Sequence, residues 1–321
     1  MTARADLHVH SKHSNQPTEW ILRQLRAPES FTEPLEIYRL CRERGMDFVT
    51  ISDHDTIDGA LEIAHLPGTF LSCEVTAELP EDRCEVHVLV LGIDEEQHRE
   101  IQRLRRNLYE LRDYLREKDI LCSVAHPLFR VNDRLTLEQF EKLLVLFDRF
   151  ETLNGMHDRH LNGMARRILT ALTPDLIHGL AERHRLEPWG DTPWIKHFTG
   201  GSDDHGGIYV ATTWTKTPSA PTVQDYLAHL RAGRCDAGGA TGSIVRLARS
   251  LDALAREYCR RQLPAVLGNG PHPRLLSLAS RWVSTHALKK GADLLDAAAL
   301  RFVADEPDIA DIGAMGRRIV A

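Results

Sequence analysis

The chain has 321 residues, which fits one α/β barrel of about 250 residues with a smaller appendage. It carries 40 basic and 46 acidic side chains, a net charge of −6, so no overall positive field would draw it to nucleic acid or to an anionic membrane. Its 42% hydrophobic and 27% charged residues exclude disorder for most of the chain. The absence of a secretory leader pattern and of an apolar run of about 18 residues predicts a cytoplasmic protein without membrane spans.

Short β-rich runs alternate with helical patterns along the chain. The expected strands are residues 5–10, 48–52, 70–75, 85–92, 121–126, 147–154 and 197–202. A helix is expected between Pro34 and Gly45, and leucines at three- and four-residue steps predict a long amphipathic helix over 96–118. A helical insertion is expected over about 155–195. Because the strands alternate with helices, the pattern favours a parallel sheet closed into a barrel over residues 1–243.

Beyond residue 243 the strand patterns stop. Residues 244–263 and 275–303 have helical spacing, so we expect a helical C-terminal region over 244–321 that packs against the barrel or against a partner. The six cysteines are widely spaced with no C-x-x-C pair, which predicts neither a disulfide framework nor a zinc ribbon.

The chain holds 17 histidines, and several of them stand beside carboxylates in or at the ends of predicted strands. In the first strand Asp6, His8 and His10 share one face, because side chains alternate along a strand. Two imidazoles on one face make half of a metal site, although a solvated polar strand end is an equal alternative. At the second strand end His54 lies between two aspartates, where the alternative is an acidic turn that caps the next helix.

Four further motifs follow the same arrangement. Glu74 ends an apolar run, and its two carboxylate oxygens could bridge two metals about 3.5–4 Å apart, although a solvated position is the common one. His87 lies inside an apolar strand, where a hydrogen-bonded core histidine is the usual explanation. His126 precedes the proline that ends its strand, and Asp203 and His205 lie in a glycine-flanked loop that could also be a plain turn. Because strand ends form the catalytic face of a parallel barrel, the motifs together predict one multinuclear site.

In order and spacing these motifs resemble the PHP family, named for polymerase and histidinol phosphatase. The matching residues are D-L-H-x-H-S at 6–11, S-D-H-D-T at 52–56, C-E-V at 73–75, E-V-H at 85–87, A-H-P at 125–127 and G-S-D-D-H at 201–205. The resemblance covers about residues 1–243 and implies a distorted (β/α)7 TIM-like barrel with two or three divalent metals. It implies that His8, His10, Glu74 and Asp203 hold one metal, that Glu74 bridges to a second held by His87 and His126, and that His54 and His205 hold a third.

The sequence departs from the family at that third metal. The family places an Asp or His where Asn15 or Gln16 stands here, and the neutral amide oxygen of Asn15 is a poor ligand. His13 is the candidate replacement, if the loop bends. The sequence therefore leaves a dinuclear and a trinuclear centre as equal alternatives.

Mixed histidine and carboxylate donors suit Zn, Mn or Fe. A cluster of such cations attracts a dianion, so we expect hydrolysis of a small phosphate ester, a nucleotide or sugar phosphate, by metal-bound hydroxide. His54 or His205 could protonate the leaving group where the metal does not engage it. Arg130 is the candidate phosphate clamp, with an exposed loop arginine as the equal alternative. Asn154 is a candidate lining residue of the pocket, whereas surface positions are favoured for His157 and His160.

Two other functions stay open. One is a nuclease on polynucleotide ends, but the chain lacks basic residues interleaved with aromatics, so nucleic acid is not the expected partner. The other is a metal-binding accessory domain attached to another enzyme, such as a glycosyltransferase, which the retained His and acid set disfavours. The sequence does not indicate an oligomeric state.

Overall fold

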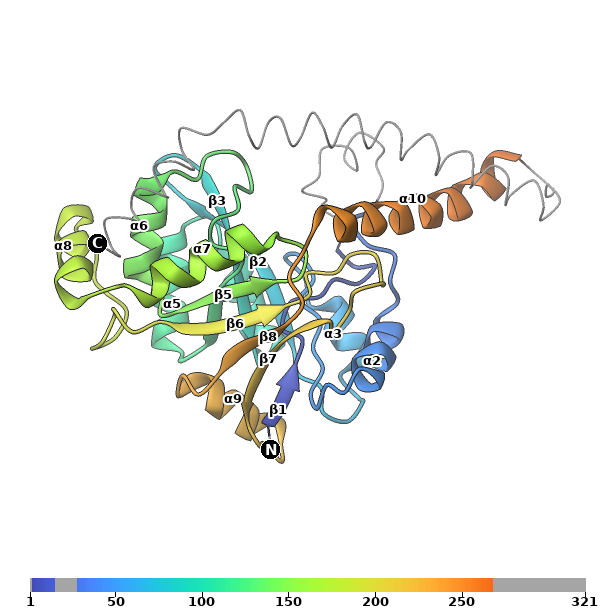
Figure 1. Ribbon diagram of the computed structural model, residues 1–321, viewed down its shortest axis with the longest axis horizontal. Coiled ribbons are helices and arrows are strands. Elements are labelled where there is room, and N and C mark those ends of the chain that lie inside the picture. The colour runs from blue at the N-terminus through green and yellow to red at the C-terminus, as the bar shows by residue number, and fades with distance from the viewer. Residues whose placement is uncertain (1, 15–27, 268–321) are drawn as a thin grey trace.

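The computed structural model describes residues 2–14 and 28–267. They form a mixed α/β structure with two sheets (Figure 1). The first sheet has the order β1 (Thr2–Ala5), β7 (Thr213–Pro218), β8 (Asp236–Gly239). The second has the order β2 (Ser72–Leu79), β3 (Cys84–Leu91), β4 (Leu121–Val124), β5 (Arg149–Asn154), β6 (His197–Gly201). The α/β class is as predicted, but the strands of the described residues do not close into one continuous barrel.

The strand directions correct the expectation of a parallel sheet. β4, β5 and β6 are parallel, whereas β2 pairs antiparallel with β3, and β3 with β4. The turn between Leu79 and Cys84 explains the first case, because a parallel pair needs a crossover of a dozen or more residues. β7 and β8 were not predicted, although Thr213, Thr215 and Thr217 repeat with the period of two typical of a strand.

The segments expected as the first two strands, residues 5–10 and 48–52, form few ladder pairs. Beyond β1 they are joined to their neighbours by single parallel bridges, Val9 to Asp204 and Val49 to Thr69. Side chains replace ladder partners here: the Val9 amide donates to Ser52 Oγ at 3.0 Å, and the Ser202 amide donates to Asp6 Oδ1 at 2.8 Å. Polar side chains thus hold extended backbone where the histidine motifs begin.

The helices follow the predicted pattern with one division. α2 (Pro34–Glu43) ends just before Gly45 as expected, and α3 (Asp58–Ile63) follows His54. The single helix expected over 96–118 is two helices, α4 (Glu95–Leu104) and α5 (Leu108–Glu117), because Asn107 begins a new helix by accepting the Tyr109 amide at 3.1 Å. The helical insertion contains α7 (Arg159–Thr170) and α8 (Pro174–His184).

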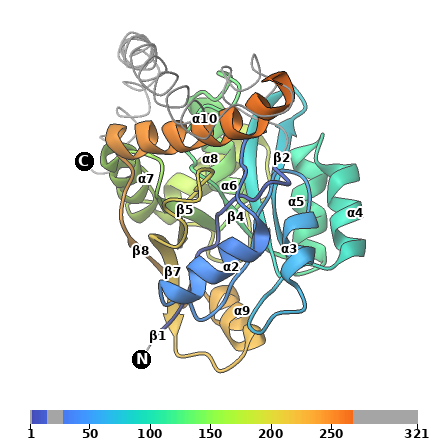
Figure 2. The same ribbon diagram turned by 90° about the vertical axis from the view of Figure 1, so that its right-hand side faces the viewer.

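The remaining helices are α6 (Leu137–Leu146), α9 (Val223–Arg231) and α10 (Ile244–Leu267). α10 lies above α2 in both views (Figures 1 and 2). The second tail helix expected at 275–303 lies outside the described residues. No helix within the described ranges combines the length and apolarity needed to cross a membrane.

Three groups of buried apolar side chains hold these elements. The largest joins the five-stranded sheet to α4–α8 and includes Phe140 and Phe150. A second surrounds Leu7 and Tyr226, and a third packs α2 and α3 on residues 49–51. The extended segments that carry the first two histidine motifs therefore pack into the core with their apolar side chains. Their polar side chains point to the other face, where the site lies.

Candidate metal centre

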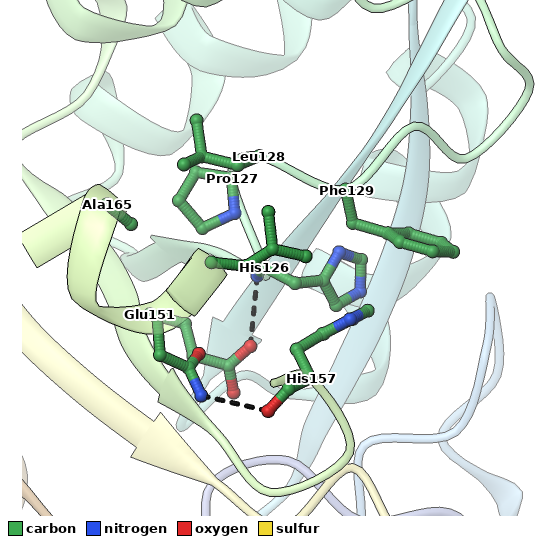
Figure 3. A pocket seen from close by; sticks show the side chains of 9 residues that line it. His126, Pro127, Leu128, Phe129, Glu151, His157 and Ala165 are labelled. Atoms are coloured by element: carbon green, nitrogen blue, oxygen red, sulfur yellow. Dashed lines mark hydrogen bonds between the residues drawn. The ribbon is translucent and has the colours of Figure 1, made fainter. Parts of the chain in front are cut away.

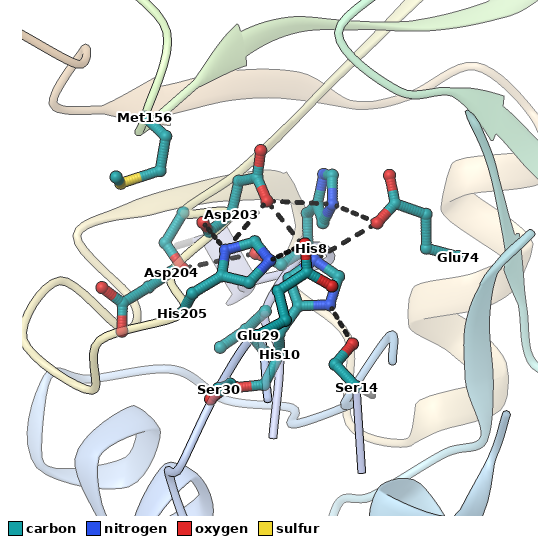
Figure 4. A network of polar contacts seen from close by, with 12 residues as sticks. His8, His10, Ser14, Glu29, Ser30, Glu74, Met156, Asp203, Asp204 and His205 are labelled. Atoms are coloured by element: carbon teal, nitrogen blue, oxygen red, sulfur yellow. Dashed lines mark hydrogen bonds and ion pairs between the residues drawn. The ribbon is translucent and has the colours of Figure 1, made fainter. Parts of the chain in front are cut away.

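Six predicted ligands converge in the structure, and we call them the core cluster. They come from five separate segments of the chain and are at most 9% exposed: His8, His10, Glu74, His87, His126 and Asp203. Figure 4 shows His8, His10, Glu74 and Asp203 pointing toward one another. The convergence that the motifs predict is therefore present in the fold.

Glu74 occupies the middle of the core cluster. Its Oε2 lies 3.0 Å from His8 Nε2 and 3.2 Å from His10 Nε2. Its Oε1 lies 2.9 Å from His87 Nδ1 and 3.2 Å from His126 Nε2. One carboxylate thus directs its two oxygens at two different histidine pairs, which is the arrangement of a ligand that bridges two metals.

Asp203 is a fourth donor beside His8, His10 and Glu74. Its Oδ1 lies 3.4 Å from His8 Nε2 and 3.3 Å from His10 Nε2. Tetrahedral ligands with bonds of about 2.0–2.1 Å stand about 3.3 Å apart, so these separations suit one ion. The buried atoms His8 Nε2, His10 Nε2, Glu74 Oε2 and His87 Nδ1 make no hydrogen bond in the described structure. The donor set therefore fits metal ions that the donors would share.

Backbone strain marks two of the core residues. His126 has φ 26° and Asp203 has φ 51°, in the left-handed region that residues other than glycine rarely adopt. Such conformations cost about 1–3 kcal/mol each and persist where surrounding contacts impose them, commonly at functional sites. The strain is consistent with side chains held in place for binding.

Charge in the core cluster is strongly coupled. Burial would raise the pKa of Glu74, but His8, His54 and His87 lower it well below its usual value. Burial likewise lowers the pKa of His8, but Asp203, Glu74 and Glu151 outweigh it and raise the pKa well above its usual value. Both carboxylates of the cluster stay ionised, as metal ligands must.

Glu151 and Asn154 support the core cluster from behind, and the sequence analysis missed Glu151. Its Oε1 lies 3.1 Å from His8 Nδ1, and its Oε2 accepts the His126 amide and Asn154 Nδ2, both at 2.9 Å. Asn154 Nδ2 also donates to Asp203 Oδ2 at 2.9 Å. A carboxylate behind a histidine orients its ring for a metal. The register of β5 against β6 shifts between Glu151 and Leu153, so positions 151 and 154 both face the site although they are three residues apart. No motif singled out Glu151.

A second group, which we call the loop cluster, consists of Glu29, His54 and His205. Glu29 Oε2 lies 3.4 Å from His54 Nε2, and Glu29 Oε1 lies 3.5 Å from His205 Nε2. Glu29 is 2% exposed, and His10, His54 and His205 offer nitrogens within 4.8 Å of one another. No sequence motif marks Glu29, because the family places the corresponding ligand where Asn15 or Gln16 stands. Residues 15–27 lie outside the described part of the chain.

The structure places His13, the candidate replacement ligand, away from the loop cluster. Its Nε2 pairs with Glu62 Oε1 at 2.7 Å, and its side chain is 24% exposed. The turn closed by the Ser14 amide on the Ser11 carbonyl, at 3.0 Å, explains this position, because it directs His13 toward α3 and away from the loop cluster.

Both ring nitrogens of His54 face carboxylates, Nδ1 at 3.3 Å from Glu74 Oε2 and Nε2 toward Glu29. Burial lowers the pKa of His54 to about 3, against the opposing effect of Glu29 and Glu74. Burial would also lower the pKa of His205, but Glu29 and Asp203 raise it to about 9. These contacts suit metal ligation by His54 better than the proton donation suggested from the sequence.

The remaining predicted positions divide into two kinds. Arg130 donates from Nη2 to the Asp133 carbonyl in its own turn, so its role as a phosphate clamp stays a prediction. Asp55 accepts the Thr76 amide at 2.9 Å and pairs with Arg105, so it does not cap the following helix, which was the structural alternative at this motif. His160 is exposed as expected, whereas His157 lies with its ring against His126.

A scan against models of known protein families finds no match. An uncharacterized protein of Methanocaldococcus jannaschii is 37% identical over 92 residues, which are 28% of this chain and 52% of that protein. The chain therefore matches about half the length of this relative.

Similar solved structures include PsfC from Pseudomonas syringae PB-5123, with 17% identity and a TM-score of 0.45 over 82% of this chain and 99% of that one. A candidate metal-dependent phosphoesterase from Bifidobacterium adolescentis has 18% identity and a TM-score of 0.33 over 63% of this chain and 88% of that one. An amidohydrolase from Chromobacterium violaceum, with bound sulfate and no metal, has 17% identity and a TM-score of 0.33 over the same shares, 63% and 88%. Scores at this level do not establish a shared fold.

Proposed function

We propose that the chain is a metal-dependent phosphoesterase of the PHP type, which hydrolyses a small phosphate monoester at two metals held by the core cluster. The observation that supports this most is the position of Glu74, with Oε2 3.0 Å from His8 Nε2 and Oε1 2.9 Å from His87 Nδ1. The ordered motifs from Asp6 to His205 support the family assignment.

The residues of the core cluster would divide the work as follows. His8, His10 and Asp203 would hold one metal, His87 and His126 the other, and Glu74 both. When bound, the metals would activate water and neutralise charge on the phosphoryl oxygens. Glu151 would keep His8 Nδ1 hydrogen-bonded, so that Nε2 faces the first metal. Imidazole and carboxylate donors together suit Zn, Mn or Fe.

We further propose that the loop cluster holds a third divalent cation. Glu29 supplies the anionic donor that Asn15 lacks, since its two oxygens face His54 Nε2 and His205 Nε2 at 3.4 and 3.5 Å. The donor set is again nitrogen and carboxylate oxygen, so the same metals suit both clusters. A third cation would add positive charge beside the phosphoryl group.

Metal analysis combined with a substrate screen tests the proposal. Purified chain loaded with Zn, Mn or Fe is assayed on a phosphate monoester, a phosphate diester and a single-stranded oligonucleotide. We expect monoester hydrolysis that disappears in His126→Ala and persists in the control His160→Ala, which alters an exposed histidine. Activity on oligonucleotides alone would support a nuclease instead, and bound metal without turnover on any substrate would contradict an enzymatic role.

A further inference from the structure

His157 lies at the edge of the core cluster, although the sequence favoured a surface position for it. Its ring centroid is 5.2 Å from that of His126 and 4.7 Å from that of Phe129. One of its ring nitrogens lies within 4.8 Å of a nitrogen of His126 and an oxygen of Asp203, which themselves lie within that distance of each other. Figure 3 shows the imidazoles of His126 and His157 side by side.

The main chain of His157 is held at several points. Its amide donates to Asn154 Oδ1 at 3.2 Å. Its carbonyl accepts Asn162 Nδ2 at 3.1 Å, Thr241 Oγ1 at 3.2 Å and the Gly242 amide at 2.8 Å. Binding groups work best when neighbouring residues fix them in advance, so these hydrogen bonds prepare the ring for a defined contact.

The neighbours of His157 are directed elsewhere. His126 Nε2 lies 3.2 Å from Glu74 Oε1. Asp203 Oδ1 faces His8 and His10, and Asp203 Oδ2 accepts Asn154 Nδ2 at 2.9 Å. A separate metal bound by His126, His157 and Asp203 would compete for donor atoms that already face other partners. His157 instead faces the junction between the two proposed metal sets, because His126 belongs to one and Asp203 to the other.

A small recess opens beside this junction. Its lining contains His126, Phe129, His157, Leu161 and Asn162 (Figure 3). A phosphoryl group that spans two metals would lie beside both His126 and Asp203.

We propose that His157 is a substrate-binding residue, which donates a hydrogen bond from its ring N–H to an oxygen of the phosphoryl group that spans the two metal sets. The inference rests on the proposed function and assigns one contact within that site. An imidazole carries at least one N–H in either charge state, so the contact does not depend on a change of protonation. A hydrogen bond to a charged oxygen is among the stronger kinds, so its loss should be measurable in binding alone.

The test is calorimetric binding of inorganic phosphate to the metal-loaded full chain, with metal content measured on the same samples. We expect His157→Ala to weaken phosphate binding about tenfold or more with unchanged metal content. His157→Gln should recover part of the affinity, because its amide also donates a hydrogen bond. The control His160→Ala removes an exposed histidine three positions away and should bind phosphate like the original chain.

Each other outcome would overturn the inference. Unchanged phosphate affinity in His157→Ala would show that the proposed contact does not exist. Loss of metal in that variant would show that His157 is a metal ligand instead. The proposed function fails separately: a chain that binds phosphate but hydrolyses no phosphate ester would refute it, while the binding comparison would still decide the role of His157.

Discussion

The core cluster and the loop cluster use the same kinds of side chain, but the protein holds them in different ways. In the core cluster, Glu151 and Asn154 connect His8, the His126 amide and Asp203 through hydrogen bonds of 2.9–3.1 Å. The ligands are therefore joined to one another through β5, an interior strand of the five-stranded sheet.

In the loop cluster, His54 is bridged to Glu74 of β2, but Glu29 and His205 are supported from outside the sheets. The loop that carries His205 packs on α10, where a side-chain carbon on Gly206 would lie 2.8 Å from Ser250 Oγ. The segment that carries Glu29 meets the same helix, since Arg261 lies over Phe31 at 4.9 Å. The comparison indicates that the core cluster depends on the sheet, whereas Glu29 and His205 of the loop cluster depend on the C-terminal helix.

The largest effect is expected for Glu74→Gln, because Glu74 serves both proposed metals of the core cluster and faces His54 as well. Loss of an outer hydrogen-bond partner already costs about 10- to 100-fold in metal affinity, so loss of the bridging charge should exceed about 100-fold. Metal content and phosphate ester hydrolysis measure this. The control is Glu85→Gln, a partly exposed strand residue. Retention of all metals by Glu74→Gln would contradict the bridging arrangement.

Glu29→Gln should separate the two clusters. The amide keeps the size of the side chain but loses the charge that faces His54 and His205, so we expect one metal fewer per chain with the core metals retained. Glu33→Gln is the matched control, since Glu33 is exposed and pairs with Lys12. Elemental analysis after dialysis gives the stoichiometry. Equal metal content in Glu29→Gln and the unaltered chain would show that the loop cluster holds no ion.

The same contrast explains which residues the sequence could predict. The six residues of the core cluster lie in or next to predicted strands, and a strand end has a defined place in an α/β fold. Glu29 lies in no periodic element, so only the tertiary structure brings it to His54 and His205. Glu151 lay within a predicted strand, but its role depends on the position of His8, which is distant in the sequence.

The fold was predictable to a similar extent. The α/β class and most strands follow from local patterns, whereas strand direction depends on the length of connections and on pairing partners. The segment around Asp6 shows the limit. Its apolar residues indicate a strand, but Asp6 accepts the amides of Ser202 and Ala211, at 2.8 and 2.7 Å, in place of a ladder partner. Hydrogen bonds across about 200 positions are not visible in a local pattern.

Glu151→Gln should weaken metal binding by the core cluster about 10- to 100-fold without abolishing it. The Gln side chain can still accept the His126 amide, so the fold should persist, but the negative charge behind His8 is lost. Titration of the metal-free chain with Zn in competition with a chelator measures the change. An exposed acid on α6, altered as Glu138→Gln, provides the control. If Glu151→Gln weakened only the loop cluster, the assignment of support to β5 would be wrong.

The smallest effect is expected for Arg246→Ala in α10. The Arg246 guanidinium lies 4.2 Å from the centre of the Tyr209 ring, and its Nη2 also donates to Thr212 Oγ1, so it fixes the loop that follows His205. An exposed cation–π contact contributes about 0.5–1 kcal/mol, which corresponds to about a two- to fivefold change in affinity. We expect a loss of that size for the metal of the loop cluster alone. Hydrogen exchange over residues 204–212 should also increase.

Arg249→Ala is the matched control for this change, because Arg249 is an exposed arginine of the same helix. The metal affinity of the core cluster is measured in a Glu29→Gln background, and that of both clusters in the unaltered background. The two measurements distinguish an effect on the loop cluster from an effect on the whole chain. If Arg246→Ala weakened both clusters equally, α10 would act through the stability of the whole chain, and the division of support between sheet and helix would fail. A loss confined to the loop cluster would mean that α10 affects the site through the loop after His205, which Arg246 contacts. The core ligands would be unaffected, because Glu151 and Asn154 connect them independently of that loop.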